Sequence, residues 1–510
     1  MRKEAIFSIF VCVAILSTIF PMGLDNEAEA YSNNLQPPSE EWNHTYGGDN
    51  YDLLYYVLQT NDGKYVSVGV ITKYDSYGNE VQYAWIIKVD ENGNLEWENT
   101  ALPNYVAVSP TSVKQISDGG YIVCGYYTAN DGSWRGFLWK LNSEGETEWT
   151  KLYDERIWDL IEVNDGYICT GYVVLSNDDY DAILLKADKS GTIQWKKTYR
   201  YGNGIDTARS IYETDDGYVI GGYAGTDKGL DFWLIKTDKN GNKQWDKTYG
   251  GEKDELFSTR TCFQTSDGGF LMAGWTSSYG AGNDDIWLVK TDGNGNMIWN
   301  ETYGGKGRDR IWGASPADNG YILACTKNYG KTGGSRGDVW VIRTDSDGNV
   351  VWSQIFGGRK EDRGYHICST NDGGYIVAGR TESFGAGNSD GWLIKIAPDK
   401  ELLRPSIQLT KPKNGYIYLF DVIGIPFPFF SQAIVLGDIT FQVEASCGSE
   451  GYVISKVEYF IDGKLVGEAT ESPFSYKWTG AEPGTYYLKA RAYNSWGGTS
   501  QVTALIKKVM

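Results

Sequence analysis

Residues 231–251 read DFWLIKTDKNGNKQWDKTYGG, and close relatives of this phrase recur along the chain about every fifty residues. The gaps between the tryptophans that close successive copies are 55, 52, 46, 50, 54 and 53 residues. A period of this length in a chain rich in Gly, Tyr and Trp is typical of a repeat array. The seven closing residues are Trp42, Trp97, Trp149, Trp195, Trp245, Trp299 and Trp352.

Each period predicts four short antiparallel strands. A strand such as 374–379, GYIVAG, follows an Asp-Gly turn, and an apolar run such as 286–289 leads to a second turn at Asn294-Gly295. Such turns collect Gly, Asn and Asp because these residues tolerate positive φ. No part of the repeat region has a sustained 3.6-residue apolar period, so helices are not expected. Seven four-stranded units predict an all-β fold with a seven-bladed β-propeller.

The two ends of the array predict how it closes. The strand around Trp42 precedes the first unit, whereas the last unit stops after 392–396 without a tryptophan strand. Pairing these two strands would complete the last blade and remove two exposed sheet edges. The predicted propeller therefore covers residues 41–399 and is closed by its N-terminal strand. We expect each tryptophan to have a structural role, wedged between neighbouring blades.

The N-terminus has the features of a secretory signal peptide. Arg2 and Lys3 precede an apolar stretch at 5–20, and Ala28-Glu29-Ala30 supplies a small-x-small cleavage site. We expect a signal peptide at 1–30 and a linker at 31–40, with an uncleaved anchor as the alternative. The mature chain is then expected outside the cell or at its surface, without an integral membrane span.

Composition excludes several functions. A net charge of -19 and a pI near 4.7 argue against nucleic acid or an anionic membrane as partner. The chain has only two histidines, His44 and His366, which are too few for a His-ligated zinc site. They also leave few candidates for the histidine of a Ser-His-Asp triad. Its cysteines have no C-x-x-C spacing, which excludes a metal knuckle and makes a disulfide framework improbable. No catalytic or metal-binding residue is therefore assigned.

A second domain is predicted at 404–510. Six segments alternate apolar and polar residues at strand spacing, as expected of an immunoglobulin-like sandwich: 406–410, 439–445, 454–461, 474–478, 485–493 and 501–506. The segment 416–436 is nearly all apolar but contains Pro426 and Pro428, which argue against a spanning helix. We expect it to pack as a hydrophobic hairpin on the sandwich or the propeller; an exposed docking patch is the alternative.

Both domains resemble known modules. The pattern TYGG, DGGYIVAG, WLIK-D-x-x-G-N-x-x-W over about 41–398 resembles a family of exported archaeal and bacterial propellers described as repeat proteins. The pattern VEYFIDGKLVGEATESPFSYKW, from Val457, resembles the Ig-like modules of many archaeal and bacterial surface proteins. These resemblances imply the two folds and imply no chemistry.

Acidic residues recur where each blade begins, just after the Gly-Gly pair, and Arg310 and Arg363 directly follow two of them. In a propeller these positions lie on one face, near the mouth of the central channel. A ring of carboxylates there could hold a cation such as Ca²⁺ or bind sugar hydroxyls; alternatively each aspartate caps its own turn or pairs with an arginine. The candidate residues are Asp52, Asp206, Asp254, Asp309 and Asp362.

Three Gly-rich loops at 277–285, 328–338 and 383–390 are predicted on that same face. In one interpretation they bind a ligand through Tyr279, Tyr329 and Phe384. In the other they are long connections between strands, and their aromatic side chains face solvent. The D-x-N-G-N turns on the opposite face resemble the start of a calcium loop but lack its Glu and flanking helices, so we interpret them as hairpin turns. No other cofactor is predicted. Two sequons, at Asn43 and Asn300, are possible glycosylation sites on the outer strands.

The sequence thus predicts an exported binding protein that recognises an extracellular protein or glycan through the loop-rich face. The alternatives are a glycan-active hydrolase or lyase with an acidic funnel, and a structural component of a surface layer. Two unlike carboxylates close together in a cleft would favour the enzyme, whereas turn-capping aspartates would favour binding. Fold alone does not choose among these functions.

Overall fold

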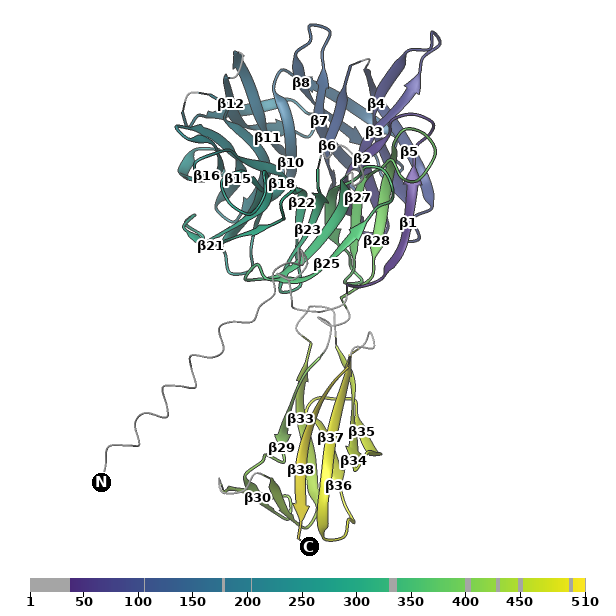
Figure 1. Ribbon diagram of the computed structural model, residues 1–510, viewed down its shortest axis with the longest axis vertical. Coiled ribbons are helices and arrows are strands. Elements are labelled where there is room, and N and C mark those ends of the chain that lie inside the picture. Colours follow the sequence, from purple (N-terminus) through teal and green to yellow (C-terminus); the bar gives the residue numbers. More distant parts are fainter. Residues whose placement is uncertain are drawn as a thin grey trace, which may run out of the picture. The chain divides into compact units, whose positions relative to one another are not determined.

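The computed structural model describes residues 37–104, 106–176, 179–202, 204–329, 337–399, 405–427, 432–447, 453–494 and 499–509. The predicted signal peptide and the first part of the linker lie outside these ranges. The described residues form strands and no helix (Figure 1). Within this described part, no helix has the length and apolar content needed to cross a membrane.

The repeat region folds into propeller-like four-stranded antiparallel sheets, and the described residues form seven of them. The first strands are β2 (Leu53–Gln59), β6 (Val108–Gln115), β10 (Arg156–Val163), β14 (Thr207–Thr214), β18 (Glu255–Gln264), β22 (Arg310–Ala317) and β26 (Asp362–Ser369). The second strands are β3 (Tyr65–Tyr74), β7 (Tyr121–Thr128), β11 (Gly166–Ser176), β15 (Gly217–Thr226), β19 (Phe270–Thr276), β23 (Gly320–Lys327) and β27 (Tyr375–Thr381).

The third and fourth strands complete each sheet. The third strands are β4 (Glu80–Val89), β8 (Trp134–Leu141), β12 (Asp179–Asp188), β16 (Gly229–Asp238), β20 (Asp285–Thr291), β24 (Asp338–Asp345) and β28 (Asp390–Ile396). The fourth are β5 (Leu95–Asn104), β9 (Thr147–Tyr153), β13 (Ile193–Tyr199), β17 (Lys243–Tyr249), β21 (Met297–Tyr303), β25 (Val350–Phe356) and β1 (Glu40–Tyr46), which pairs with β28. Each first strand contacts the first strand of the next sheet, and β26 contacts β2.

Within a sheet, the Asp-Gly turn is tied to the third strand by an ion pair. The Lys290 ammonium lies 2.8 Å from a carboxylate oxygen of Asp267, and this contact holds the pKa of Asp267 at about 2. The lysine is buried while the aspartate reaches solvent, so the turn neutralises a charge inside the sheet. The same pair recurs as Lys88–Asp62, Lys140–Asp118, Lys186–Asp165, Lys236–Asp216 and Lys395–Asp372.

Between sheets, the tryptophan and the TYGG tyrosine of one fourth strand meet a single glycine of the next sheet. The Tyr249 hydroxyl donates a hydrogen bond of 2.6 Å to the Gly295 carbonyl, and a Cβ on Gly295 would lie 2.8 Å from the Trp245 ring. We call this arrangement the glycine clamp. Its other hydroxyl–carbonyl pairs are Tyr46–Gly93, Tyr153–Gly191, Tyr199–Gly241 and Tyr303–Gly348, and the Asn99 amide replaces tyrosine at Gly145.

Trp352 has a different partner, because β28 is not followed by a hairpin turn of this kind. Its indole nitrogen donates a hydrogen bond of 2.5 Å to Asp399, which also accepts from Tyr375 at 2.7 Å and from Arg343 at 3.1 Å. Arg343 stands where sister sheets have the lysine of the Lys–Asp ion pair. A buried polar cluster thus replaces the glycine clamp at this junction.

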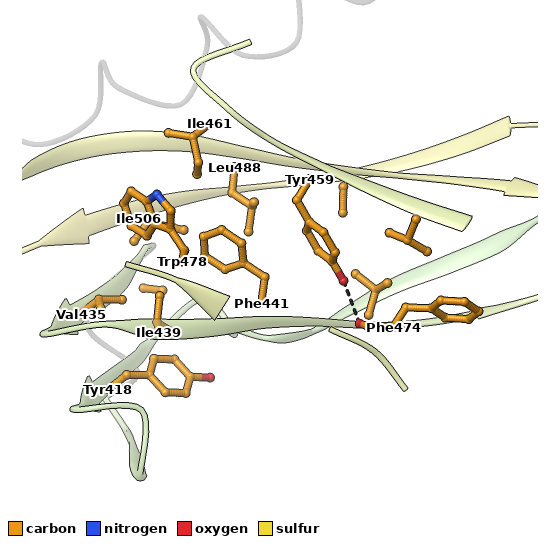
Figure 2. Close-up of a cluster of buried hydrophobic side chains, with 14 of the residues drawn as sticks. Tyr418, Val435, Ile439, Phe441, Tyr459, Ile461, Phe474, Trp478, Leu488 and Ile506 are labelled. Carbon is orange, nitrogen blue, oxygen red and sulfur yellow. Dashed lines mark hydrogen bonds between the residues drawn. The ribbon is translucent and has the colours of Figure 1, made fainter. Parts of the chain in front are cut away.

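The C-terminal domain is a sandwich of two sheets with the core shown in Figure 2. The Tyr459 hydroxyl donates a hydrogen bond of 2.7 Å to the Phe474 carbonyl, and the rings of Phe441 and Trp478 stack at 5.5 Å. One sheet has the order β29 (Ser406–Lys411), β33 (Ile439–Ser446), β36 (Phe474–Trp478). The other has β31 (Ile423–Pro426), β30 (Tyr416–Leu419), β32 (Ala433–Leu436), β38 (Thr499–Lys508), β37 (Gly484–Asn494), β34 (Ile454–Ile461), β35 (Lys464–Ala469).

The apolar segment 416–436 packs only in part. Tyr418, Ala433 and Val435 join the sandwich core, as a packed hairpin requires. The expectation is wrong for β31, whose residues are all exposed, because β31 is the edge strand of its sheet and nothing described covers it. Residues 428–431, which include Pro428, lie outside the described part.

The glycine clamp gives a matched test of stability. Gly295 and Gly268 belong to the same sheet and have φ of +75° and +81°, but an added Cβ meets Trp245 only at Gly295 and open space at Gly268. Gly268→Ala should lose about 1 kcal/mol for the left-handed backbone alone. Gly295→Ala should lose clearly more, because the indole must also move. Urea unfolding of both variants measures the difference; equal losses would show that the clamp does not stabilise the sheet junction.

Candidate functional site

Four of the predicted aspartates lie buried beneath the turn that precedes each first strand. Asp309 accepts hydrogen bonds from the backbone amides of Gly305, at 2.9 Å, and Asn328, at 2.8 Å. The second bond links the turn to the Gly-rich loop, so the two lie side by side as predicted. Asp52, Asp206 and Asp362 accept equivalent bonds from their own turns and from the end of the second strand or the loop that follows it. These contacts are the turn caps that the sequence offered as the alternative to a ligand site.

Asp254 does not occupy the equivalent position. Glu255 does: its carboxylate accepts from the Gly251 amide at 2.8 Å and from the Thr276 hydroxyl at 2.8 Å. Asp254 is exposed and accepts from the Leu230 amide instead. The inclusion of Asp254 in the repeated set is therefore corrected to Glu255, whose longer side chain reaches the same turn from one position later.

A second buried carboxylate, from the start of the third strand, approaches the caps at Asp309 and Asp52. A Cβ on Gly304 would lie 1.9 Å from an Asp285 oxygen and 3.0 Å from an Asp309 oxygen, so the glycine lies between both groups. Burial raises the pKa of Asp285, and the charge of Asp309 adds to the effect. Burial and the charge of Asp52 raise the pKa of Asp390 to about 6. One oxygen of each of these third-strand residues has no hydrogen-bond partner.

The D-x-N-G-N turns are closed by their own side chains. The Asp292 carboxylate accepts hydrogen bonds of 2.8 Å from the backbone amides of Asn294 and Asn296. The side-chain amide of Asn296 donates a further bond of 2.9 Å to the same carboxylate. Asp90, Asp238 and Asp345 repeat this pattern. No group of three or more potential metal-ligating side chains occurs in the described ranges.

The first strands surround a cavity of about 250 Å³. Six first strands carry a one-residue β-bulge whose residue lines this cavity: Tyr55, Thr111, Trp158, Arg209, Trp312 and Tyr365. In β18 the register breaks over residues 258–261, and Arg260 from this stretch completes the ring. A bulge re-aims a side chain that the regular alternation of a strand would direct elsewhere. Ser109, Tyr126 and Arg363 complete the lining.

The cavity is basic and aromatic, although the whole chain is acidic. None of the ten lining residues is acidic. Among the described residues, Arg209 and Arg260 have no carboxylate within 4 Å, whereas Arg363 pairs with Glu361. The Arg209 guanidinium stacks on the Trp158 ring at 4.2 Å. The predicted carboxylates do not line this cavity, since they bind the turns instead.

Below the bulges, the same strands hold a buried cluster. The Lys114 ammonium donates a hydrogen bond of 2.8 Å to the Tyr56 hydroxyl, and His366 stacks on the Tyr56 ring at 3.9 Å. Burial lowers the pKa of His366 well below its usual value, so the imidazole is neutral. The other histidine, His44, is exposed beside Trp42.

The three loop aromatics are separated by the fold. Tyr329 adjoins the cavity: its ring lies 5.7 Å from Trp312 and 4.5 Å from the Arg363 guanidinium. Tyr279 and Phe384 are partly exposed and pack on third-strand tryptophans, at 5.4 and 5.5 Å, outside the cavity lining.

Both sequon asparagines are exposed on fourth strands. The Asn300 amide oxygen accepts a bond of 3.0 Å from the Trp287 indole, and Asn43 accepts the same bond from Trp392. The six cysteines of the described part are free, and four of them, Cys124, Cys169, Cys262 and Cys325, are buried. Burial raises the pKa of these four thiols well above their usual value.

Comparisons with known proteins bear mainly on the second domain. A family model described as a bacterial Ig domain matches residues 430–490, in agreement with the sandwich. No curated protein matches the chain. Similar solved structures include Clostridium thermocellum CbhA fibronectin(III)-like modules, at 23% identity over 21% of this chain and 98% of that chain, with a TM-score of 0.16.

Two propeller-like structures are similar to the repeat region at low identity. The Neurospora crassa Pan2 WD40 domain is 9% identical over 56% of this chain and 91% of that chain, with a TM-score of 0.37. A subtype N10 neuraminidase-like protein of A/little yellow-shouldered bat/Guatemala/060/2010 is 13% identical over 70% of this chain and 98% of that chain, with a TM-score of 0.34. Likenesses at this level carry no argument about activity.

The carboxylate pairs predict that stability falls as pH rises. A carboxyl group whose pKa is raised in the folded state binds its proton more tightly there, so protonation stabilises the fold. For Asp390 this gain in unfolding free energy is complete below about pH 4 and is lost as the pH rises through about 6. Asp390→Asn should therefore reduce the loss of unfolding free energy between pH 5 and pH 8. Urea unfolding at both pH values measures this; a pH dependence identical to that of the wild type would contradict the raised pKa.

Proposed function

We propose that the seven sheets are the blades of a β-propeller closed through β1, and that the exported protein binds an anionic extracellular ligand in the cavity at the centre of the first strands. Pairing of β1 with β28 and contact of β26 with β2 support closure. Each first strand contributes one side chain from its irregular stretch to one cavity, as a central channel requires.

The observation that carries the function is the positive charge of the cavity lining, which includes three arginines and no acidic residue. Arg209 and Arg260 have no ion-pair partner among the described residues, although the chain has nineteen more negative than positive charges. Burial lowers the pKa of Arg260 although the nearby Asp159 carboxylate favours its charged form, so the guanidinium group has lost solvation that its surroundings do not fully replace. A carboxylate, sulfate or phosphate group of a ligand would remove this cost and accept several N–H bonds from the planar guanidinium groups.

The geometry of the donors supports the same ligand chemistry. Arg209 and Arg260 each use one terminal nitrogen in a protein contact, to the Tyr223 hydroxyl and the Tyr55 carbonyl respectively. The Nε–H groups of Arg209, Arg260 and Arg363 and the indole N–H of Trp158 have no partner. The guanidinium groups and hydroxyls of the lining favour a ligand rich in hydrogen-bond acceptors.

Binding is better supported than hydrolysis. A glycosidase needs two carboxyl groups across a cleft, and the lining residues supply none. The repeated carboxylates serve as turn caps, a structural need that recurs from blade to blade. The unlike residues of the molecule are those at the bulges, where a single asymmetric ligand would be recognised. A role in a surface layer has no observation in its favour.

Closure gives the first test of this proposal. Deleting residues 41–46 removes most of β1, including Trp42, and leaves β28 as an unpaired edge. The variant should unfold at a clearly lower temperature and aggregate. Differential scanning calorimetry with light scattering measures both effects. A melting temperature equal to that of the full mature chain would refute closure through this strand.

The cavity gives the second test, with D-galacturonate as the anionic probe and D-galactose as its uncharged match. The wild type should bind galacturonate, more weakly at high salt, and galactose much less. Arg209→Gln should weaken galacturonate binding about tenfold or more, since one charge-assisted contact is removed. Isothermal titration calorimetry measures each affinity.

Arg135→Gln serves as the control, because Arg135 is a half-buried arginine that pairs with Asp131 outside the cavity lining. This variant should bind like the wild type. Equal affinity for the two sugars, an equal loss in both variants, or no galacturonate binding at millimolar concentration would contradict an anion site at the bulges.

A further inference from the structure

Aromatic rings and a guanidinium group form a continuous stack beside the cavity. The Arg156 guanidinium lies 3.6 Å from the centre of the Tyr126 ring, 4.7 Å from Trp134 and 4.8 Å from Trp158. The Tyr126 ring meets Trp134 edge-on at 5.2 Å and lies 5.0 Å from Trp158. We call these four residues, Tyr126, Trp134, Arg156 and Trp158, the aromatic platform.

The platform leads into the cavity. Tyr126 and Trp158 line the cavity, and the opposite side of the stack continues from Trp158 to the Arg209 guanidinium at 4.2 Å. Trp134 begins β8, directly after the turn that links it to β7, and 38% of its surface is exposed. A ligand held at Arg209 therefore has an exposed aromatic surface next to it.

The donors of the platform are not all satisfied by described residues, and Trp134 is not fully covered. Arg156 has no carboxylate within 4 Å among the described residues, and its protein hydrogen bond runs from Nη1 to the Tyr172 hydroxyl. Its Nε–H group has no partner, and neither has the indole N–H of Trp158. A stack that served only to join two sheets would be expected to satisfy these donors and to bury Trp134.

These features match one ligand chemistry. The sugar rings of an acidic polysaccharide offer C–H faces that cover aromatic rings, and charged groups that repeat along the chain. The cavity would take one charged sugar at Arg209, and the platform would take the neighbouring sugar, with its charge at Arg156 and its ring on Trp134. An acidic peptide carries similar charges but no rigid apolar face at each residue.

We propose that the aromatic platform is a second sugar subsite, so that the ligand is an acidic oligosaccharide of at least two charged residues. This inference rests on the proposed anion site in the cavity. It names a ligand class and adds Trp134 and Arg156 to the binding surface, neither of which lines the cavity.

The test compares D-galacturonate with its α-1,4-linked tetramer by isothermal titration calorimetry on the full mature chain. The wild type should bind the tetramer at least about tenfold more tightly than the monomer. Trp134→Ala should remove most of this gain, about fivefold or more, while leaving monomer affinity and melting temperature unchanged. Arg209→Gln should weaken both ligands.

Tyr77→Ala is the matched control, since Tyr77 is an exposed aromatic residue on the corresponding turn between β3 and β4 and has no ring contact in the described part. It should leave both affinities unchanged. Tetramer binding no tighter than monomer binding, or the same tetramer loss in both variants, would overturn the platform while the cavity site stands. Loss of monomer binding in Trp134→Ala would assign Trp134 a structural role and overturn it too.

A short poly-glutamate peptide tests whether the ligand is an acidic peptide and not an acidic oligosaccharide. The platform predicts that poly-glutamate binds less tightly than the tetramer and that Trp134→Ala does not alter its affinity. Equal affinity for peptide and tetramer, with equal sensitivity to Trp134→Ala, would contradict a sugar subsite. Failure of the wild type to bind galacturonate in either form would instead refute the cavity site itself.

Discussion

The contact on which the repeat region depends is the glycine clamp between neighbouring sheets. In the clamp, a glycine of a hairpin turn has positive φ and packs its Cα against an indole ring. Its carbonyl accepts a hydrogen bond from a tyrosine hydroxyl. Only glycine allows both the backbone conformation and the approach of the ring. The contact joins the D-x-x-G-N turn of one sheet to the W and TYGG residues of the sheet before it. The two halves of the repeated phrase are therefore the two sides of one interface.

This arrangement leaves the first strands free to vary. Turns, ion pairs and clamps recur nearly unchanged because every junction has the same needs, and the aspartate caps belong to this repeated framework. The bulged residues of the first strands differ from sheet to sheet and meet in one cavity. The rigid, repeated periphery thus holds seven side chains of four kinds close together, and this set carries the proposed recognition of an anionic ligand.

Much of the framework could be predicted from the sequence, and the cavity could not. The tryptophan period, the Asn-Gly turns and six strands of the second domain are local patterns, and each agrees with the strands observed. A β-bulge depends on register between two strands, which no local pattern encodes. Sequence position does give one indication of which residues line the cavity. Five of them lie three residues after the acidic residue that opens a blade: Tyr55, Trp158, Arg209, Trp312 and Tyr365. The exposure of β31 could not be predicted either, because it depends on whether another segment covers the edge of the sheet. The apolar composition of residues 416–436 does not reveal this.

The most direct test of the central claim is a crystal structure of the mature protein grown with selenate, an anion that anomalous scattering locates without ambiguity. We expect a selenate ion in the cavity, within hydrogen-bond distance of the Arg209 and Arg260 guanidinium groups. A cavity that holds only water at saturating selenate, or an ion bound only at surface lysines, would contradict an anion site at the centre of the first strands.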